Sequence, residues 1–231
     1  MKKTLQRIMK KDMINCENLD GIYVNFNEND ITKANAIIIG PKNTVYENGF
    51  LLFNIYFPNN YPYVPPIVEY VSFSNIRIHP NLYKNGKVCL SLLGTWPGPS
   101  WTSIMDISSI LLSIQSLLTD NPLRNEPGYE TINGEINDNY NEIIKYNTID
   151  SLILNTYTHL PPDFLFFKEK LKDYFIKNLD QIKNQINKNI ETNLLVNVNI
   201  YRIKKIINYK KLLVKFNQII VDEKLFTPLN I

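Results

Sequence analysis

Closely spaced, strand-like segments constrain the fold of this chain more than any other feature. Residues 21–26, 34–39 and 49–57 are rich in β-branched and aromatic residues, and only short connections separate them. Parallel neighbours would need a crossover of a dozen or more residues, so the spacing predicts an antiparallel meander. A fourth strand is expected at residues 67–72. It follows a loop, residues 57–66, whose four prolines remove backbone donors and fix φ.

Helical periodicity flanks the predicted meander. Residues 2–13 form a short amphipathic segment, with its apolar side at Leu5, Ile8, Met9 and Met13. Apolar residues three or four apart predict further helices at residues 104–118, 140–159, about 163–190 and about 200–221, whereas residues 184–199 are ambiguous between helix and loop. The sequence therefore predicts an α+β domain with a four-stranded antiparallel meander and several C-terminal helices.

Composition excludes several classes of function. The 231 residues carry 25 basic and 22 acidic side chains, a balance that does not favour nucleic-acid binding. No apolar run is long enough to span a bilayer. The two cysteines, Cys16 and Cys89, and two histidines lack the spacing of a disulfide framework or a zinc site, so no metal or cofactor is expected. The cytoplasm or the nucleus is the expected compartment.

The residues around Cys89 support two interpretations, a buried core residue and a functional site. Cys89 alternates with apolar residues in 87–93, a pattern typical of a small buried core residue. It also lies in a long aperiodic stretch, 73–103, that contains both tryptophans and several glycines and prolines, and long irregular segments are typical of functional sites. A Cys/His hydrolase would need a base near Cys89, and neither His79 nor His159 has protease-like spacing.

A motif around Cys89 resembles a known family. His79-Pro80-Asn81, followed by Cys89 eight residues after the asparagine, resembles the signature of ubiquitin-conjugating enzymes. The proline-rich loop upstream and Trp101 before the long helix are in the family's order. The stretch that follows Cys89 is similar to the larger branch typified by type Z, with type O as a cousin. The resemblance implies the UBC fold, with a catalytic domain at residues 1–178 and a helical extension at residues 179–231.

The resemblance also implies a chemistry for this motif. Cys89 would accept ubiquitin or a ubiquitin-like protein from an activating enzyme as a thioester, because a thiolate is the nucleophile in thioester exchange. The modifier would then pass to a lysine amine of a protein substrate, usually with a RING-type or other ligase. Asn81 matches the family's oxyanion-stabilising asparagine, and alternatively it braces the loop by a hydrogen bond. His79 is expected to support the loop structurally.

The motif departs from the family's pattern at the acids that activate the attacking lysine. Many relatives place an aspartate two residues after the cysteine, where this chain has Ser91. Glu126 matches a second family acid in the loop after the long helix, and alternatively it is a solvated loop carboxylate. These departures keep a second hypothesis open, in which the chain is a catalytically inactive variant that serves as a binding or regulatory module.

Two partner surfaces follow from the same resemblance. The basic face of the first helix, with Lys2, Lys3 and Arg7, matches the region where the family meets its activating enzyme. That helix together with Tyr63, Ser103 and Ile104 matches the ligase-binding patch. A proline-rigid loop suits recognition because docking costs little conformational entropy. The alternatives are a solvated basic face and ordinary packing of Tyr63. Neither nucleic acid nor a membrane is an expected partner.

Overall fold

The computed structural model describes residues 2–225 and divides the chain into two compact units, Met1–Ile132 and Asn133–Ile231. Each unit contains both helices and a β-sheet, so the predicted α+β class is confirmed. The predicted catalytic domain, residues 1–178, extends into the second unit and stays a prediction. Within residues 2–225, no helix has the length and apolar character needed to cross a membrane.

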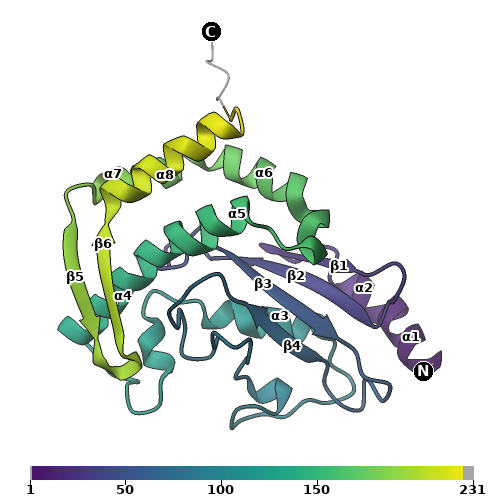
Figure 1. Ribbon diagram of the computed structural model, residues 1–231. Coiled ribbons are helices and arrows are strands. Elements are labelled where there is room, and N and C mark those ends of the chain that lie inside the picture. The colour runs from purple at the N-terminus through teal and green to yellow at the C-terminus, as the bar shows by residue number, and fades with distance from the viewer. Residues whose placement is uncertain (1, 226–231) are drawn as a thin grey trace. The chain divides into compact units, whose positions relative to one another are not determined.

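The predicted meander forms the centre of the first unit. Strands β1 (Ile22–Phe26), β2 (Lys33–Ile39), β3 (Phe50–Tyr56) and β4 (Ile67–Val71) pair antiparallel in sequence order, as Figure 1 shows. Each strand lies within one residue of its predicted bounds. The short connections leave no other pairing order without a crossover, which explains why the sequence pattern suffices here.

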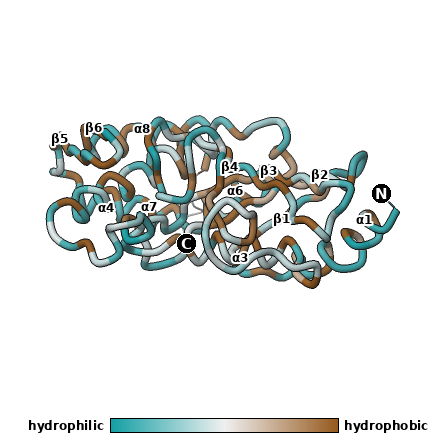
Figure 2. Tube along the Cα trace, turned by 90° about the horizontal axis from the view of Figure 1, so that it is seen from below, coloured by the Kyte–Doolittle hydropathy of each residue, from teal (hydrophilic) through white to brown (hydrophobic). Residues whose placement is uncertain are grey.

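The core of the first unit lies between this sheet and helix α3 (Ile107–Leu117), which runs along one face of the sheet (Figure 1). Ile107, Ile110, Leu111 and Ile114 of α3 are fully buried. In Figure 2 the tube is largely hydrophobic beside β2 and β3 and hydrophilic at the start of the chain. The burial of these apolar side chains is the main favourable term in folding this unit.

The predicted start of the long helix was wrong. Asp106 takes the N-cap position, and its side chain accepts a hydrogen bond of 3.0 Å from the backbone N–H of Ser108. An N-cap carboxylate satisfies a backbone donor that has no partner inside the helix, so the helix begins at Ile107. Ile104 therefore precedes the helix and is 77% exposed, rather than continuing its apolar side.

The N-terminal helical segment is present but buries a different face from the one predicted. It runs without a break through α1 (Lys2–Arg7), a π-helical turn (Ile8–Asp12) and α2 (Met13–Asn15). Thr4, Ile8 and Asp12 are buried, whereas Met9 is 57% exposed and Met13 is exposed as well. Apolar periodicity does not predict the buried face of this segment, because two of its three buried residues, Thr4 and Asp12, are polar.

Hydrogen bonds explain these two buried polar side chains. The Thr4 hydroxyl lies 3.0 Å from the carbonyl oxygen of Tyr61 and 2.8 Å from that of Asn59. The Asp12 carboxylate accepts hydrogen bonds from the Tyr61 hydroxyl and, at 2.9 Å, from the backbone N–H of Ile107. Burial raises the pKa of Asp12, which these bonds partly oppose. Asp12 thus joins the N-terminal helix to the proline loop and to the start of α3.

The second unit is mainly helical, as predicted for residues 140–159 and 163–190. The first of these regions is continuous, and the second is interrupted at Asn178. The helical elements are α4 (Glu135–Asn147), a π-helical stretch (Thr148–Asn155), α5 (Thr156–Thr158), a 3-10 turn (Pro162–Phe167), α6 (Lys168–Lys177), α7 (Leu179–Lys188) and α8 (Tyr209–Asp222).

A β-hairpin in the second unit contradicts the sequence prediction. Strands β5 (Asn193–Val198) and β6 (Ile203–Asn208) pair antiparallel, where the pattern predicted ambiguous structure and the first turns of a helix. The helix begins only at Tyr209, after the Asn208 side chain caps it by accepting a bond of 3.0 Å from the N–H of Lys211. The isoleucines in 203–207 fit helical spacing, but β-branched residues also pack well on the pleated surface of a sheet. The pairing of β6 with β5 gives this segment its strand conformation.

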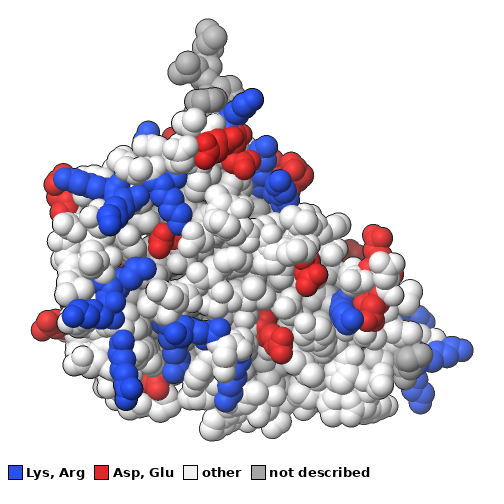
Figure 3. All heavy atoms as spheres, in the orientation of Figure 1, with Lys and Arg blue, Asp and Glu red and all other residues white. Residues whose placement is uncertain are grey.

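Some basic side chains of the second unit form ion pairs within that unit. Lys215 lies 2.7 Å from the Asp150 carboxylate, and Lys205 lies 3.8 Å from the same group. Figure 3 shows further Lys and Arg side chains on the face that carries β5 and β6. The basic side chains of residues 202–215 therefore include both internal ion pairs and solvated charges.

Candidate active site

Cys89 lies in the irregular segment that connects β4 to α3. A 3-10 turn, Ser91–Leu93, begins two residues after it. Cys89 is only 2% exposed, so the pattern that suggested a buried residue described its environment correctly. Its backbone forms a reciprocal pair with Asn81. The N–H of Cys89 donates to the carbonyl of Asn81 at 2.9 Å, and the Asn81 side-chain amide donates to the carbonyl of Cys89, also at 2.9 Å.

Both ring nitrogens of His79 form hydrogen bonds in this arrangement. The backbone N–H of Asn81 donates to Nδ1 of His79 at 2.9 Å, so Nε2 carries the proton and donates to the carbonyl of Leu117 at 3.0 Å. Burial lowers the pKa of His79 to about 3. Both ring nitrogens are engaged, so His79 does not serve as a base for Cys89, and the geometry does not favour a Cys/His hydrolase.

His79 should make the stability of the folded chain depend on pH. Its pKa is about 3 when folded and near the ordinary 6.5 when unfolded, so the unfolded chain binds the proton between these values. The stabilisation is therefore complete above pH 6.5 and is lost as the pH falls toward 3, at up to about 1.4 kcal/mol per pH unit. Urea unfolding at pH 7.5 and 4.5 should show a larger difference for the wild type than for His79→Asn. An equal difference in both proteins would contradict this.

Thr95 approaches the Cys89 backbone from the side opposite Asn81. The Thr95 hydroxyl accepts a hydrogen bond of 2.9 Å from the N–H of Leu90 and donates one of 2.7 Å to the carbonyl of Val88. The residues on either side of Cys89 are thus bonded to one side chain. Nothing in the sequence pattern predicts this role, because Thr95 is one polar residue in an exposed loop rich in glycine and proline.

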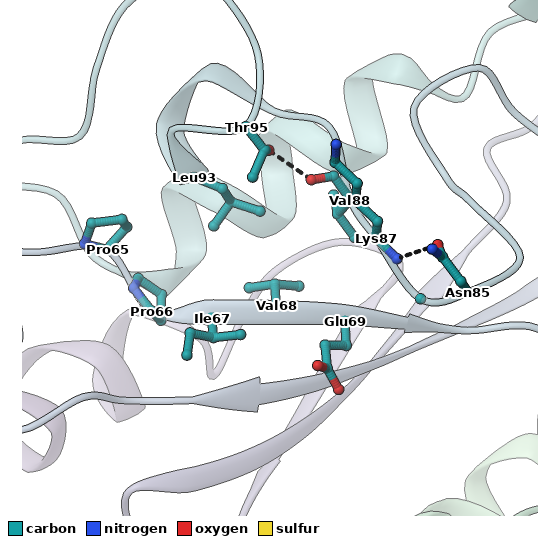
Figure 4. Close-up of a pocket in the computed structure, with 11 residues that line it drawn as sticks. Pro65, Pro66, Ile67, Val68, Glu69, Asn85, Lys87, Val88, Leu93 and Thr95 are labelled. Carbon is teal, nitrogen blue, oxygen red and sulfur yellow. Dashed lines mark hydrogen bonds between the residues drawn. The ribbon is translucent and has the colours of Figure 1, made fainter.

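A pocket of about 360 Å³ borders the same segment. Figure 4 shows it between the start of β4, at Ile67 and Val68, and the chain at Val88, with Leu93 and Thr95 on the rim. The hydrogen bond between Thr95 and Val88 is drawn there. The pocket leaves room beside the Val88 side of the Cys89 segment.

Glu126 is placed beside the His79-Pro80-Asn81 turn by an arginine. Its carboxylate lies 3.8 Å from the Arg77 guanidinium, which donates to the carbonyl of Pro80 and stacks 3.7 Å from the centre of the Tyr83 ring. Glu126 is partly buried, so it differs from the solvated loop carboxylate considered as the alternative. Within residues 2–225 there is no cluster of three or more His, Cys, Asp or Glu side chains that could hold a metal ion.

Comparison with known proteins identifies the family of this chain. Residues 5–148 match the family model described as ubiquitin-conjugating enzyme. The chain belongs to the ubiquitin-conjugating enzyme family. It is 49% identical over 133 residues to ubiquitin-conjugating enzyme E2 Z of Xenopus tropicalis. The aligned residues cover 56% of this chain and 42% of that relative. The human E2 Z is 50% identical over 133 residues, 37% of its length. The matches therefore span less than half of these relatives.

A solved structure confirms the predicted fold of this family member. A ubiquitin conjugating enzyme E2 domain of Toxoplasma gondii aligns with a TM-score of 0.51 and 26% sequence identity. The alignment covers 64% of this chain and 97% of that one. The UBC fold and the similarity to the type Z branch, both predicted from the sequence, are confirmed.

The three residues predicted to contact an activating enzyme are not equally exposed to solvent. Lys2 and Lys3 are exposed, and Figure 3 shows basic side chains where α1 begins. Arg7 is partly buried instead, because its guanidinium donates to the carbonyl of Met105 and lies 3.8 Å from the Asp12 carboxylate. Arg7 therefore already serves an internal contact.

The residues predicted to meet a ligase are all exposed. Tyr63 is 75% exposed and Ile104 is 77% exposed, and Ser103 is exposed beside Ile104. Two hydrogen bonds fix the segments that carry them. The Trp101 indole N–H donates to the carbonyl of Pro62 at 2.7 Å, and Lys11 of the N-terminal helical segment donates to the carbonyl of Ile104. Tyr63 is thus not packed beneath the proline loop.

Proposed function

We propose that this chain is an active ubiquitin-conjugating enzyme that carries ubiquitin or a ubiquitin-like protein as a thioester on Cys89. The observation that supports this most directly is the reciprocal pairing of Cys89 with Asn81, at 2.9 Å in both bonds. The Asn81 amide, an uncharged donor, therefore lies next to the residue that would carry the thioester, and the carbonyl oxygen of that thioester would become the tetrahedral oxyanion. Uncharged donors aimed at a developing oxyanion are a large source of catalysis.

The proposed reaction has two steps. In loading, the Cys89 thiolate attacks the thioester carbonyl between the modifier and an activating enzyme, and the thiolate of the activating enzyme leaves. In transfer, a neutral lysine amine attacks the new thioester, an amide bond forms, and the Cys89 thiolate leaves while the amine's proton passes to a base. Asn81 would stabilise the oxyanion with the second hydrogen of its amide, because the first already binds the carbonyl of Cys89.

A non-catalytic binding module is not favoured. Loss of the cysteine is the mark of inactive members of this family, and Cys89 is present in a segment braced by hydrogen bonds on two sides. Ser91 replaces the aspartate of many relatives, but that departure concerns activation of lysine and leaves the thioester step intact.

A loading assay tests the proposal. The protein is incubated with an activating enzyme, ATP and ubiquitin, or with a ubiquitin-like protein and its own activating enzyme, and is then separated without reductant. An adduct that disappears on addition of reductant is expected. If no pairing of modifier and activating enzyme gave such an adduct, the proposal would be wrong.

Glu126 is proposed as the base that positions and deprotonates the lysine. Glu126→Gln should slow discharge to free lysine about tenfold at neutral pH while loading is unchanged, since general-base catalysis contributes at least that much. The difference should shrink as the pH rises, because more lysine is then neutral without help. Discharge followed from pH 7 to 9.5 on non-reducing gels measures this.

Asp120→Asn provides the matched control for Glu126→Gln, since Asp120 is an exposed carboxylate in the same loop region. It should discharge at the wild-type rate at every pH. If Glu126 only held Arg77 in place, Glu126→Gln would slow discharge equally at all pH values, which would contradict the proposed role.

The partners follow from the same proposal. The activating enzyme would bind the α1 face through the exposed Lys2 and Lys3, next to the partly buried Arg7. A RING-type or other ligase would bind the exposed patch with Tyr63, Ser103 and Ile104. Protein lysines would be the acceptors, and the cytoplasm or the nucleus the compartment.

A further inference from the structure

The backbone around Cys89 is held from two sides, and only one of them involves the Asn81 motif. On the first side, Asn81 bonds to both the N–H and the carbonyl of Cys89 itself. On the second side, the Thr95 hydroxyl bonds to the N–H of Leu90 and to the carbonyl of Val88. The Thr95 N–H adds a longer bond of 3.3 Å to the carbonyl of Leu90. Thr95 therefore spans the cysteine.

The loop that carries Thr95 is exposed but anchored. Gly98, with φ of 136°, packs so closely that an added Cβ would meet the Cβ of Ser91 at 3.0 Å. At the far end, the Trp101 indole N–H donates to the carbonyl of Pro62 at 2.7 Å. Residues 94–100 thus fold back toward the segment that follows Cys89, and Thr95 holds a defined position there.

A pocket borders the Val88 side of this segment. The pocket of about 360 Å³ between β4 and Val88 leaves space there, as Figure 4 shows. A backbone segment beside such a space can shift when its hydrogen bonds are removed. Val88 itself is buried, and the residues before it are tied to β4 by the bridge between Glu69 and Lys87 and by the 2.8 Å bond from the N–H of Tyr70 to the carbonyl of Gly86. From Val88 to Leu90, the bonds from Thr95 oppose such a shift on the side away from Asn81.

We propose that Thr95 is a positioning residue for the Cys89 thioester. This inference rests on the proposed function. Thr95 does not touch the reacting atoms, and it acts through the backbone of Val88 and Leu90. It keeps the thioester carbonyl aligned with the Asn81 amide, and a displacement of about 1 Å in such an alignment can cost on the order of 100-fold in rate.

Two substitutions of matched shape test the proposal. Thr95→Val keeps the volume and removes the hydroxyl, whereas Thr95→Ser keeps the hydroxyl and removes the methyl group. In single-turnover discharge to lysine, Thr95→Val should lower the maximal rate about tenfold without raising the half-saturating lysine concentration, as expected for lost alignment. Thr95→Ser should remain within about twofold of the wild type, since it retains the hydroxyl. Thr95 is exposed, so neither change creates a cavity in the core.

A second readout uses the free protein and needs no modifier. The Cys89 thiolate displaces iodide from iodoacetamide, and mass spectrometry follows the carbamidomethyl product at each cysteine. Thr95→Val should raise the alkylation rate of Cys89 at least about threefold, because a loosened segment opens more often. Cys16 reports unfolding of the same unit, since burial raises the pKa of its thiol to about 12. Its rate should stay unchanged.

These outcomes separate the inference from the proposed function. Failure of the wild-type protein to load would refute the thioester proposal and would leave the alkylation rates to decide whether Thr95 positions Cys89. The inference is overturned if Thr95→Val discharges and alkylates within about twofold of the wild type, a change too small for lost alignment. It is also overturned if Thr95→Ser is as impaired as Thr95→Val, or if Cys16 is alkylated faster together with Cys89.

Discussion

Cys89→Ala is expected to abolish the modifier adduct completely, whereas Cys16→Ala should load at the wild-type rate. The two residues are the only cysteines of the chain, and both are buried. They differ in chemistry. Burial, with the nearby Asp12 and Asp106 carboxylates, raises the pKa of Cys16 to about 12, so almost no thiolate forms there at neutral pH.

Cys89→Ser adds a sharper test of the same site. A serine oxygen at this position should give an adduct that resists reductant but is cleaved by mild alkali, because an ester replaces the thioester. The adducts are compared on non-reducing gels with and without reductant. Loading of Cys89→Ala, or loss of loading in Cys16→Ala, would show that the site is assigned to the wrong residue.

Asn81→Ala should lower discharge to lysine on the order of 100-fold, the usual effect of removing one oxyanion donor. The structure offers a second explanation for any such loss, because the Asn81 amide also bonds to the carbonyl of Cys89 at 2.9 Å. Asn81→Asp keeps the shape of the side chain and removes the N–H groups. It should be as slow as Asn81→Ala if the amide donor is what matters.

Alkylation of Cys89 separates the two roles of Asn81. If Asn81 only braces the loop, Asn81→Ala should change the alkylation rate of Cys89 in the free protein as well as the discharge rate. If Asn81 also stabilises the oxyanion, discharge falls by a much larger factor than the one by which the alkylation rate changes. A discharge rate within about twofold of the wild type would exclude both roles, since either loss should exceed that.

The sequence predicted the parts of the fold that depend on short-range pattern. Four strands with short connections leave few ways to pair, and α3 has four buried apolar residues at helical spacing. The apolar pattern gave a wrong prediction where hydrogen bonds of polar side chains or strand pairing determine the structure. Thr4 and Asp12 are buried with hydrogen bonds to residues that are distant in the sequence, and strand pairing overrode helical spacing in residues 203–207.

The candidate site was predictable only in part for a similar reason. Cys89 and Asn81 were found because their spacing resembles a family motif, whereas local pattern alone marks Cys89 as a buried residue. Thr95 and Arg77 carry no such signature. Each acts on backbone carbonyls, of Val88 and Pro80, and a backbone acceptor leaves no trace in the sequence.

Helix α3 is attached at both of its ends to other parts of the first unit. At its start, Asp12 accepts from the N–H of Ile107, and at its end the carbonyl of Leu117 accepts from His79. Each added residue would turn one end by about 100° and move it by about 1.5 Å relative to the other. An insertion or deletion of one residue would therefore break one of the two attachments. The number of residues in α3 is fixed by these bonds, so loops rather than this helix should absorb changes in chain length.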